Sequence, residues 1–116
     1  MTKIPGAPWL DQVQIAFTYC AEDGEILYMN RVSSETFVAD GGEQLIGKNA
    51  LDCHPESAKR KMQELLEHPA LNAYTIEKQG HKKMIYQVPV WDGDTVKGIV
   101  EISLPLPESL PHFVRK

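Results

Sequence analysis

Hydrophobic and polar residues alternate along two stretches of this chain, one near each end. In the first stretch, apolar residues recur at every second position from Val13 to Tyr19, and an apolar run at residues 26–29 follows. A period of two is typical of a strand with one face on the core. Because Asp23 and Gly24 lie between the two runs and tolerate positive φ, the pattern predicts an antiparallel hairpin.

The second stretch predicts three further strands, at residues 74–78, 83–91 and 96–104. Turn residues around Gly80 and Gly93 separate them, which is typical of hairpins. Alternation puts one apolar stripe of the last two strands on a single face, which we expect to be the core face. That stripe comprises Met84, Tyr86, Val88, Val90, Val100, Ile102 and Leu104.

The opposite parity of these strands carries Lys97, Glu101 and Ser103, which we therefore expect to point away from the core. Pro89 cannot donate a ladder hydrogen bond, so it indicates an edge or a bulge.

Helical patterns occupy the middle of the chain. Asn30 stands where an N-cap residue would accept a free backbone N–H, and residues 31–38 predict a short helix anchored by Phe37. Residues 43–46 predict another helical turn, which Gly47 ends.

A longer helix is expected after Pro55, because proline suits the first helical position. Its apolar residues recur at helical spacing, and Pro69 ends it. They are Ala58, Met62, Leu65 and Leu66. The order of elements predicts an α+β fold, in which a five-stranded antiparallel sheet carries short helices and one longer helix on one face.

Composition narrows the function classes. A length of 116 residues suits one domain, and a net charge of −4 argues against nucleic acid as a partner. The basic run Lys59, Arg60 and Lys61 is diluted by nearby glutamates, so it is typical of a solvated helix face. No apolar run approaches the roughly 20 residues that span a bilayer, and the start lacks a signal-peptide pattern. We expect a cytoplasmic protein that does not bind membranes.

The run Cys53, His54 and Pro55 is the main chemical candidate. His54 is a candidate ligand for haem iron or a hydrogen-bond donor to a bound molecule, since histidine serves in both roles. The alternative is a simple helix start, with Cys53 as a small buried residue. The sequence leaves both open.

Catalytic and metal motifs are absent. Adjacent cysteine and histidine rarely form a nucleophile pair, and no third orienting group accompanies them. The four histidines and two cysteines show no zinc-ligand spacing, and no glycine-rich phosphate loop occurs. We therefore expect no metal site and no intrinsic turnover.

The ordered set of segments resembles a PAS domain. The matching stretches are "DGEILYMN", "EQLIGKN" and "MIYQVPVWDGDTVKGIVEISL", and the resemblance covers residues 13–104. "IGKNALDCHPESAKRKMQELLE" is similar to the PAS-like branch associated with DUF438-type proteins. On this basis residues 1–12 form a lead-in or cap, 13–104 the PAS-like domain, and 105–116 a proline-rich C-terminal tail.

The resemblance implies a sensory module that binds a small molecule or cofactor between sheet and helices and acts through protein association. The expected ligand-binding residues are Tyr28, Phe37, Cys53, His54, Met62, Tyr86 and Val88. The alternative is a helix start for Cys53 and His54, and plain core for the other five. The cofactor is not identified. A small organic ligand is expected over haem, because His54 and His68 lie at the ends of the long helix, whereas haem-binding relatives usually carry the iron ligand within it.

Two alternatives remain beside the sensory module. One is a haem or redox protein that uses His54 or Cys53, and the other is an empty PAS fold that serves as an interaction scaffold. A homodimer is expected, and a signalling protein is a further candidate partner. Apolar Ile85, Ile99 and Trp91 would lie outside the core stripe, where Trp9, Leu10 or Phe113 of the flanking segments would cover them.

Overall fold

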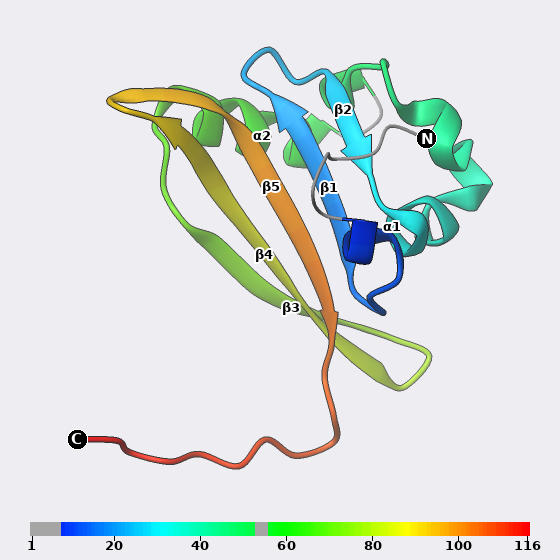
Figure 1. The fold of residues 1–116 in the computed structure, drawn as a ribbon, viewed down its shortest axis with the longest axis vertical. Coiled ribbons are helices and arrows are strands. Elements are labelled where there is room, and N and C mark those ends of the chain that lie inside the picture. The colour runs from blue at the N-terminus through cyan, green and yellow to red at the C-terminus, as the bar shows by residue number, and fades with distance from the viewer. Residues whose placement is uncertain (1–7, 53–55) are drawn as a thin grey trace.

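Five strands form one antiparallel sheet in the order β2-β1-β5-β4-β3 (Figure 1). This computed structural model describes residues 8–52 and 56–116, so Cys53, His54, Pro55 and the side chain of Ala58 lie outside the description. The strands are β1 (Ala16–Ala21), β2 (Ile26–Met29), β3 (Asn72–Lys78), β4 (His81–Asp92) and β5 (Thr95–Pro105). The predicted hairpins and the α+β sheet are confirmed.

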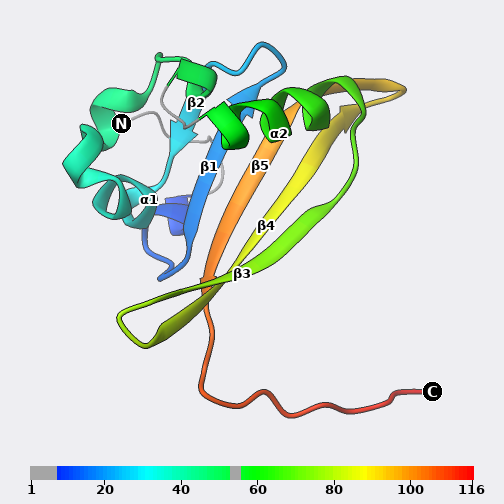
Figure 2. The same cartoon turned by 180° about the vertical axis from the view of Figure 1, so that it is seen from behind.

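Helices lie before and between the strands. The 3-10 helix η1 (Pro8–Asp11) precedes β1. Between β2 and β3 the chain forms α1 (Arg31–Thr36), η2 (Val38–Asp40), η3 (Gly42–Leu45), η4 (Ala50–Asp52) and α2 (Glu56–Glu67). Figure 2 shows α2 crossing the face of the sheet that is hidden in Figure 1. We call the face toward α2 the inner face and the opposite one the outer face.

Asn30 is the N-cap of α1, as the sequence predicts, and its side chain is fully buried. Its Oδ1 accepts hydrogen bonds from Ser33 N and Phe17 N, both at 3.0 Å. Its Nδ2 donates to Leu10 O at 2.8 Å and to Ile15 O at 2.7 Å. One amide group therefore joins the N-terminal segment, β1 and α1.

The segment around η1 lies over the ends of β1 and β2, on the outer face of the sheet (Figure 1). The Tyr28 hydroxyl donates to Asp11 Oδ1 at 3.4 Å, and Arg31 Nε donates to Asp11 O at 3.1 Å. Trp9 itself is 61% exposed. Phe113 is also exposed, because the chain after β5 runs away from the sheet.

The apolar stripe of α2 packs as predicted. Leu65 is buried, and Met62 and Leu66 are partly buried, while Glu56 and Arg60 are exposed. An ion pair joins Lys61 and Glu64 at 3.8 Å on the solvent side. A helix with one apolar stripe buries that stripe against the sheet.

The core lies between the inner face and the helices. Its buried residues are Cys20, Ile26, Met29, Leu45 and Ala50, against which Phe37, Ile46 and Met62 pack. Phe37 and Met62, two of the residues expected to bind ligand or to form core, both pack against this cluster, whereas Tyr86 does not belong to it.

The predicted faces of β4 and β5 are wrong. Thr18 is the cross-strand partner of Glu101, and Glu101 of Gln87. Partners share a face, and the Thr18 and Glu101 side chains lie with α2 residues around one cavity, so their parity is the inner one. Ile85 and Ile99 follow the same parity and are buried, at 8% and 7% exposed.

The expected core stripe lies on the outer face instead. Tyr86, Ile102 and Phe17 form one row of cross-strand partners there. Val88 and Val100 belong to the next row, together with Tyr19. Tyr28 pairs with Tyr19 and is buried beneath the η1 segment on the outer face, not on the inner face.

Pro89 occupies a position where β4 is an edge. The ladder between β3 and β4 begins with Asn72 opposite Gln87, so β3 does not reach Pro89. A register irregularity follows between Val90 and Trp91. Both features agree with the prediction.

No helix in residues 8–52 or 56–116 is long and apolar enough to cross a membrane.

Candidate functional site

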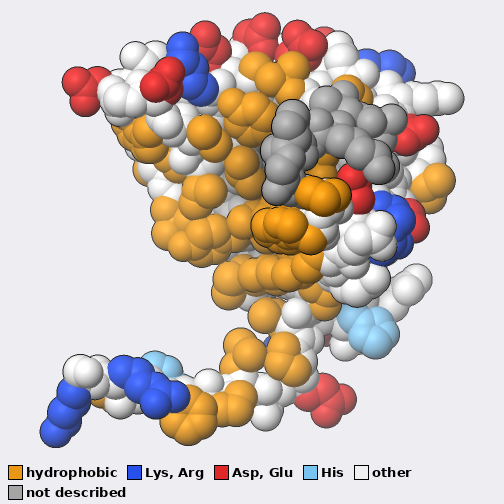
Figure 3. All heavy atoms as spheres, in the orientation of Figure 1, with side chains coloured by type: hydrophobic (Ala, Val, Ile, Leu, Met, Phe, Trp, Pro, Cys, Tyr) orange, Lys and Arg blue, Asp and Glu red, His pale blue; other side chains and the backbone are white. Residues whose placement is uncertain are grey.

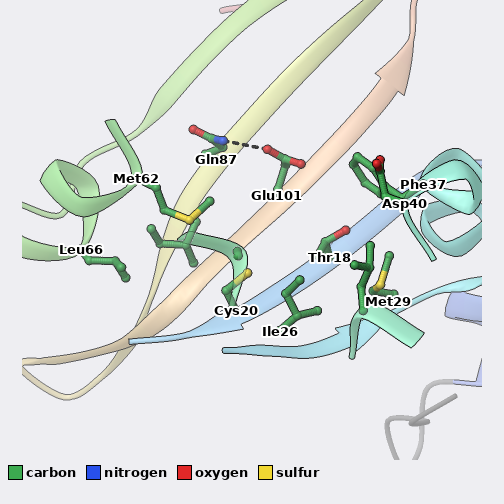
Figure 4. A pocket seen from close by; sticks show the side chains of 13 residues that line it. Thr18, Cys20, Ile26, Met29, Phe37, Asp40, Met62, Leu66, Gln87 and Glu101 are labelled. Carbon is green, nitrogen blue, oxygen red and sulfur yellow. Dashed lines mark hydrogen bonds between the residues drawn. The ribbon is translucent and has the colours of Figure 1, made fainter. Parts of the chain in front are cut away.

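A cavity of about 180 Å³ lies between the inner face of the sheet and the helical segment (Figure 4). Strands β1, β2, β4 and β5 form one wall, and α2 with the 3-10 helices forms the other. The apolar lining comprises Cys20, Ile26, Met29, Phe37, Leu45, Ala50, Met62, Leu66 and Ile99. The polar lining comprises Thr18, Asp40, Gln87 and Glu101.

Hydrogen bonds connect the polar residues of the sheet across its strands. Asn72 Nδ2 on β3 donates to Gln87 Oε1 on β4 at 2.7 Å. Gln87 Nε2 then donates to Glu101 Oε1 on β5 at 2.7 Å, the bond drawn dashed in Figure 4. On β1 the Thr18 hydroxyl hydrogen-bonds to the Ser33 hydroxyl at 2.5 Å. We call Asn72, Gln87 and Glu101 the polar ladder.

Burial in the cavity wall determines the charge state of Cys20. Burial, and to a smaller extent the Glu101 carboxylate, raise the pKa of Cys20 to about 12. The Cys20 side chain is therefore a neutral thiol at physiological pH, and it lacks the thiolate character of redox-active cysteines.

The predicted ligand-binding residues divide into three groups. Phe37 and Met62 line the cavity. Tyr28, Tyr86 and Val88 lie on the outer face, so their predicted inner position is wrong. Cys53 and His54 lie outside the described residues, and the roles proposed for them stay predictions.

The polar lining was missed at the sequence level because Gln87 and Glu101 occur at the parity taken for solvent. One signal was present. On the expected outer parity of β4 and β5, apolar Ile85 and Ile99 alternate with polar Gln87 and Glu101, and small-molecule pockets combine apolar side chains with a few polar groups.

The described residues do not fit haem. The lining includes no histidine in the described part of the chain, and the raised pKa of Cys20 opposes thiolate ligation. In those same residues, no group of three His, Cys, Asp or Glu is placed to hold a metal ion.

A sequence model of the PAS fold matches residues 10–84, more than half of the chain. The chain belongs to the PAS-fold family. The polar ladder and the cavity therefore occupy the inner face of a PAS domain. Assignment to the DUF438-associated branch stays a prediction. No curated protein sequence matches the chain.

Solved structures of PAS domains share its fold. The PAS domain of a protein from Colwellia psychrerythraea is 24% identical, and the match covers 86% of this chain and 92% of the other, with a TM-score of 0.61. A sensory box sensor histidine kinase from Vibrio cholerae is 23% identical, and the match covers 87% of this chain and 89% of the other, with a TM-score of 0.59. The Aer2 receptor of Vibrio cholerae, described as a dual PAS-heme oxygen sensor, is 13% identical. That match covers 80% of this chain and 95% of the other, with a TM-score of 0.58.

Proposed function

We propose that this PAS domain is a sensory module that binds a small organic molecule in the cavity and acts by protein association, without turnover. The observation that carries the proposal is the cavity itself. Its wall is mostly apolar, and a few polar groups converge on it, as in small-molecule sites generally.

The size of the cavity limits the ligand. Its volume of about 180 Å³ is below the range of roughly 300–1,000 Å³ that is typical of sites for drug-sized ligands. An apolar cavity of about 150 Å³ binds benzene in another protein. A ligand with one ring and a short substituent therefore suits this cavity.

The family supports a sensory role. Related folds occur in a sensor histidine kinase and in a haem oxygen sensor. Because the described lining does not suit haem, we expect the purified protein to be colourless. A Soret band in its absorption spectrum would instead favour the alternative of a haem protein that uses His54.

Native mass spectrometry tests ligand binding directly. We expect a small-molecule adduct in the native spectrum that is lost in the denaturing spectrum of the same sample. Cys20→Leu, which adds side-chain volume inside the cavity, should abolish the adduct while circular dichroism remains that of a folded protein. If neither the purified protein nor protein incubated with a library of single-ring compounds forms an adduct, the domain is an empty scaffold.

The outer face supports association as a homodimer. Phe17, Ile102 and Tyr86 form one cross-strand row, and Tyr19, Val100 and Val88 form the next. All six are half-buried in the single chain, and no charged residue interrupts either row. Figure 3 shows hydrophobic side chains gathered over this face of the sheet. Contiguous apolar patches of this kind mark interaction sites.

We call these two cross-strand rows the outer patch. Ile102→Glu tests the dimer, since it places a charge in the middle of this patch. We expect a concentration-dependent dimer in sedimentation velocity that this variant converts to monomer. The matched control is Ile76→Glu on the edge strand β3, where the side chain is already 42% exposed. A dimer unaffected by Ile102→Glu would refute the assignment of this face.

Two further expectations from the sequence stay predictions. The absence of turnover is checked with general hydrolase and redox substrates, where activity lost in Cys53→Ala or His54→Ala would contradict it. A cytoplasmic location is checked by fractionating the cells that produce the protein.

A further inference from the structure

We propose that the ligand is a small organic cation, an apolar ring or chain with a protonated nitrogen that pairs with Glu101. This inference rests on the proposed function, because it assigns a chemical class to the molecule in the same cavity.

The Glu101 carboxylate has one anchored oxygen. Its Oε1 accepts from Gln87 Nε2, and among the described residues no hydrogen bond or ion pair reaches Oε2. Glu101 is half-buried, and it lines a wall that is otherwise mostly apolar. A carboxylate in such surroundings is stabilised when a donor or cation completes its coordination.

The polar ladder directs a hydrogen-bond donor at this carboxylate. Gln87 Oε1 receives the amide hydrogen of Asn72, so the Gln87 amide group presents its Nε2 donor to Glu101. An ionised carboxylate accepts this hydrogen bond with either oxygen and has no proton of its own to donate. The neighbouring strands thus prepare a negative acceptor that faces the cavity.

The other charges around the cavity have the same sign. Asp40 contributes a second carboxylate, and it is exposed, so the cavity reaches the surface on that side. Figure 4 shows Glu101 between Met62 and Leu66 on one side and Phe37 and Asp40 on the other. Within the described lining there is no lysine, arginine or histidine. A cation is therefore attracted to the cavity, and an organic anion is repelled.

An organic cation fits the lining better than a metal ion does. Metal ions such as Ca²⁺ and Mg²⁺ require several oxygen ligands. The described residues offer no group of three candidate ligands, whereas nine apolar side chains line the cavity. An apolar ligand body packs well against the apolar wall, and a single positively charged nitrogen is enough to form an ion pair with Glu101.

Three probes of equal shape separate the possibilities. Benzylamine, benzyl alcohol and benzoate carry the same ring with a cationic, a neutral and an anionic group. Dissociation constants are measured for each by isothermal titration calorimetry or by NMR chemical shifts. A hydrogen bond to a charged group is stronger than a neutral one, so we expect benzylamine to bind about tenfold to a hundredfold more tightly than benzyl alcohol. Benzoate should bind most weakly.

Glu101→Gln is the matched variant, because glutamine keeps the shape and still accepts from Gln87. We expect it to weaken benzylamine binding at least about tenfold and to change benzyl alcohol binding by less than about twofold. The control is Glu77→Gln, since Glu77 is an exposed strand glutamate outside the cavity, and it should leave all three affinities unchanged.

The outcomes separate the two proposals. If benzyl alcohol binds as tightly as benzylamine, or if the preference for the amine survives in Glu101→Gln, the cation assignment is overturned and the ligand-binding function stands. If none of the three probes binds, the cation assignment is also overturned, and the mass spectrometry above then decides whether the cavity binds any ligand. The comparison of probes on the unmodified protein needs no variant to fold.

Discussion

Replacing Asn30 with aspartate is the sharpest test of how this fold is held together. The substitution keeps the shape of the side chain and the Oδ1 acceptor for Ser33 N and Phe17 N. It removes the amide donor, which serves Leu10 O and Ile15 O at 2.8 and 2.7 Å. Asn30 is 0% exposed, so water does not replace the lost donor.

The magnitude follows from the two carbonyl groups that lose their partner. A buried polar group left unsatisfied costs about 1–3 kcal/mol, so two of them cost about 2–6 kcal/mol. Domains of this size unfold with a free energy of about 5–15 kcal/mol. Asn30→Asp is therefore expected to remove a large part of the total stability.

The loss should depend on pH. Burial beside two carbonyl oxygens raises the folded-state pKa of the introduced carboxyl above its unfolded value of about 4. A raised pKa means that stability is present below the unfolded value and is lost as pH rises toward the folded value. Relative to the original protein, the variant should lose about 1.4 kcal/mol per pH unit over that interval.

Urea unfolding followed by circular dichroism, from pH 3.5 to 8, measures both effects. Asn49→Asp is the control, since Asn49 is half-buried and its Nδ2 donates a single bond, to Asp23 O at 2.9 Å. We expect that control to lose about 1 kcal/mol. Equal losses in the two variants, or an Asn30→Asp deficit that is independent of pH, would refute the central role of the Asn30 amide.

Two further predictions concern backbone strain and thiol burial. Gly24→Ala should lower the free energy of unfolding by more than about 1 kcal/mol, because φ is +91° and a Cβ would lie 2.7 Å from Asn49 Oδ1. Gly93→Ala, also at positive φ but facing open space, should lower it less in the same urea assay, and equal losses would contradict the contact. Because the pKa of Cys20 is raised to about 12, the free energy of unfolding should fall as pH rises above about 8.5. The fall should be steeper in the original protein than in Cys20→Ala, by up to about 1.4 kcal/mol per pH unit, and parallel pH profiles would contradict this.

Local chemistry explains why the order of elements was predictable. Asp23 and Gly24 turn the first hairpin, and Gly24 has the positive φ that such turns require. Asn30 caps α1 with its own side chain. These signals act within a few residues along the chain, so the sequence contains them in full.

The assignment of faces depended on a rule that fails here. Alternation identified which residues of β4 and β5 share a face, and this grouping is correct. It did not identify which face meets the helices. The more apolar set, including Val88 and Ile102, was assigned to the core, although the inner set contains Gln87 and Glu101. The rule that apolar residues face inward presumes a filled core and a solvated outer face.

The cavity could not be predicted at all from residue types. Phe37 and Met62 were identified as interior residues, but whether interior side chains leave space depends on how α2 and the 3-10 helices pack over the sheet. The partnership of Gln87 with Glu101 depends on the register between β4 and β5. A slip of one strand by one residue would turn that strand's side chain to the outer face and separate the pair.

The same alternation links the two proposed sites physically. Glu101 faces the cavity, and its chain neighbours Val100 and Ile102 face the outer patch, so one strand carries both the ligand contact and the proposed dimer contact. A cation that draws the Glu101 carboxylate toward the cavity also acts on the backbone that positions these two side chains. Thermodynamic linkage requires that the effect be mutual, with dimerisation changing ligand affinity by the same factor as the ligand changes dimerisation. Sedimentation with and without benzylamine measures that factor, and a value of one would mean that β5 holds two independent sites rather than a signalling route.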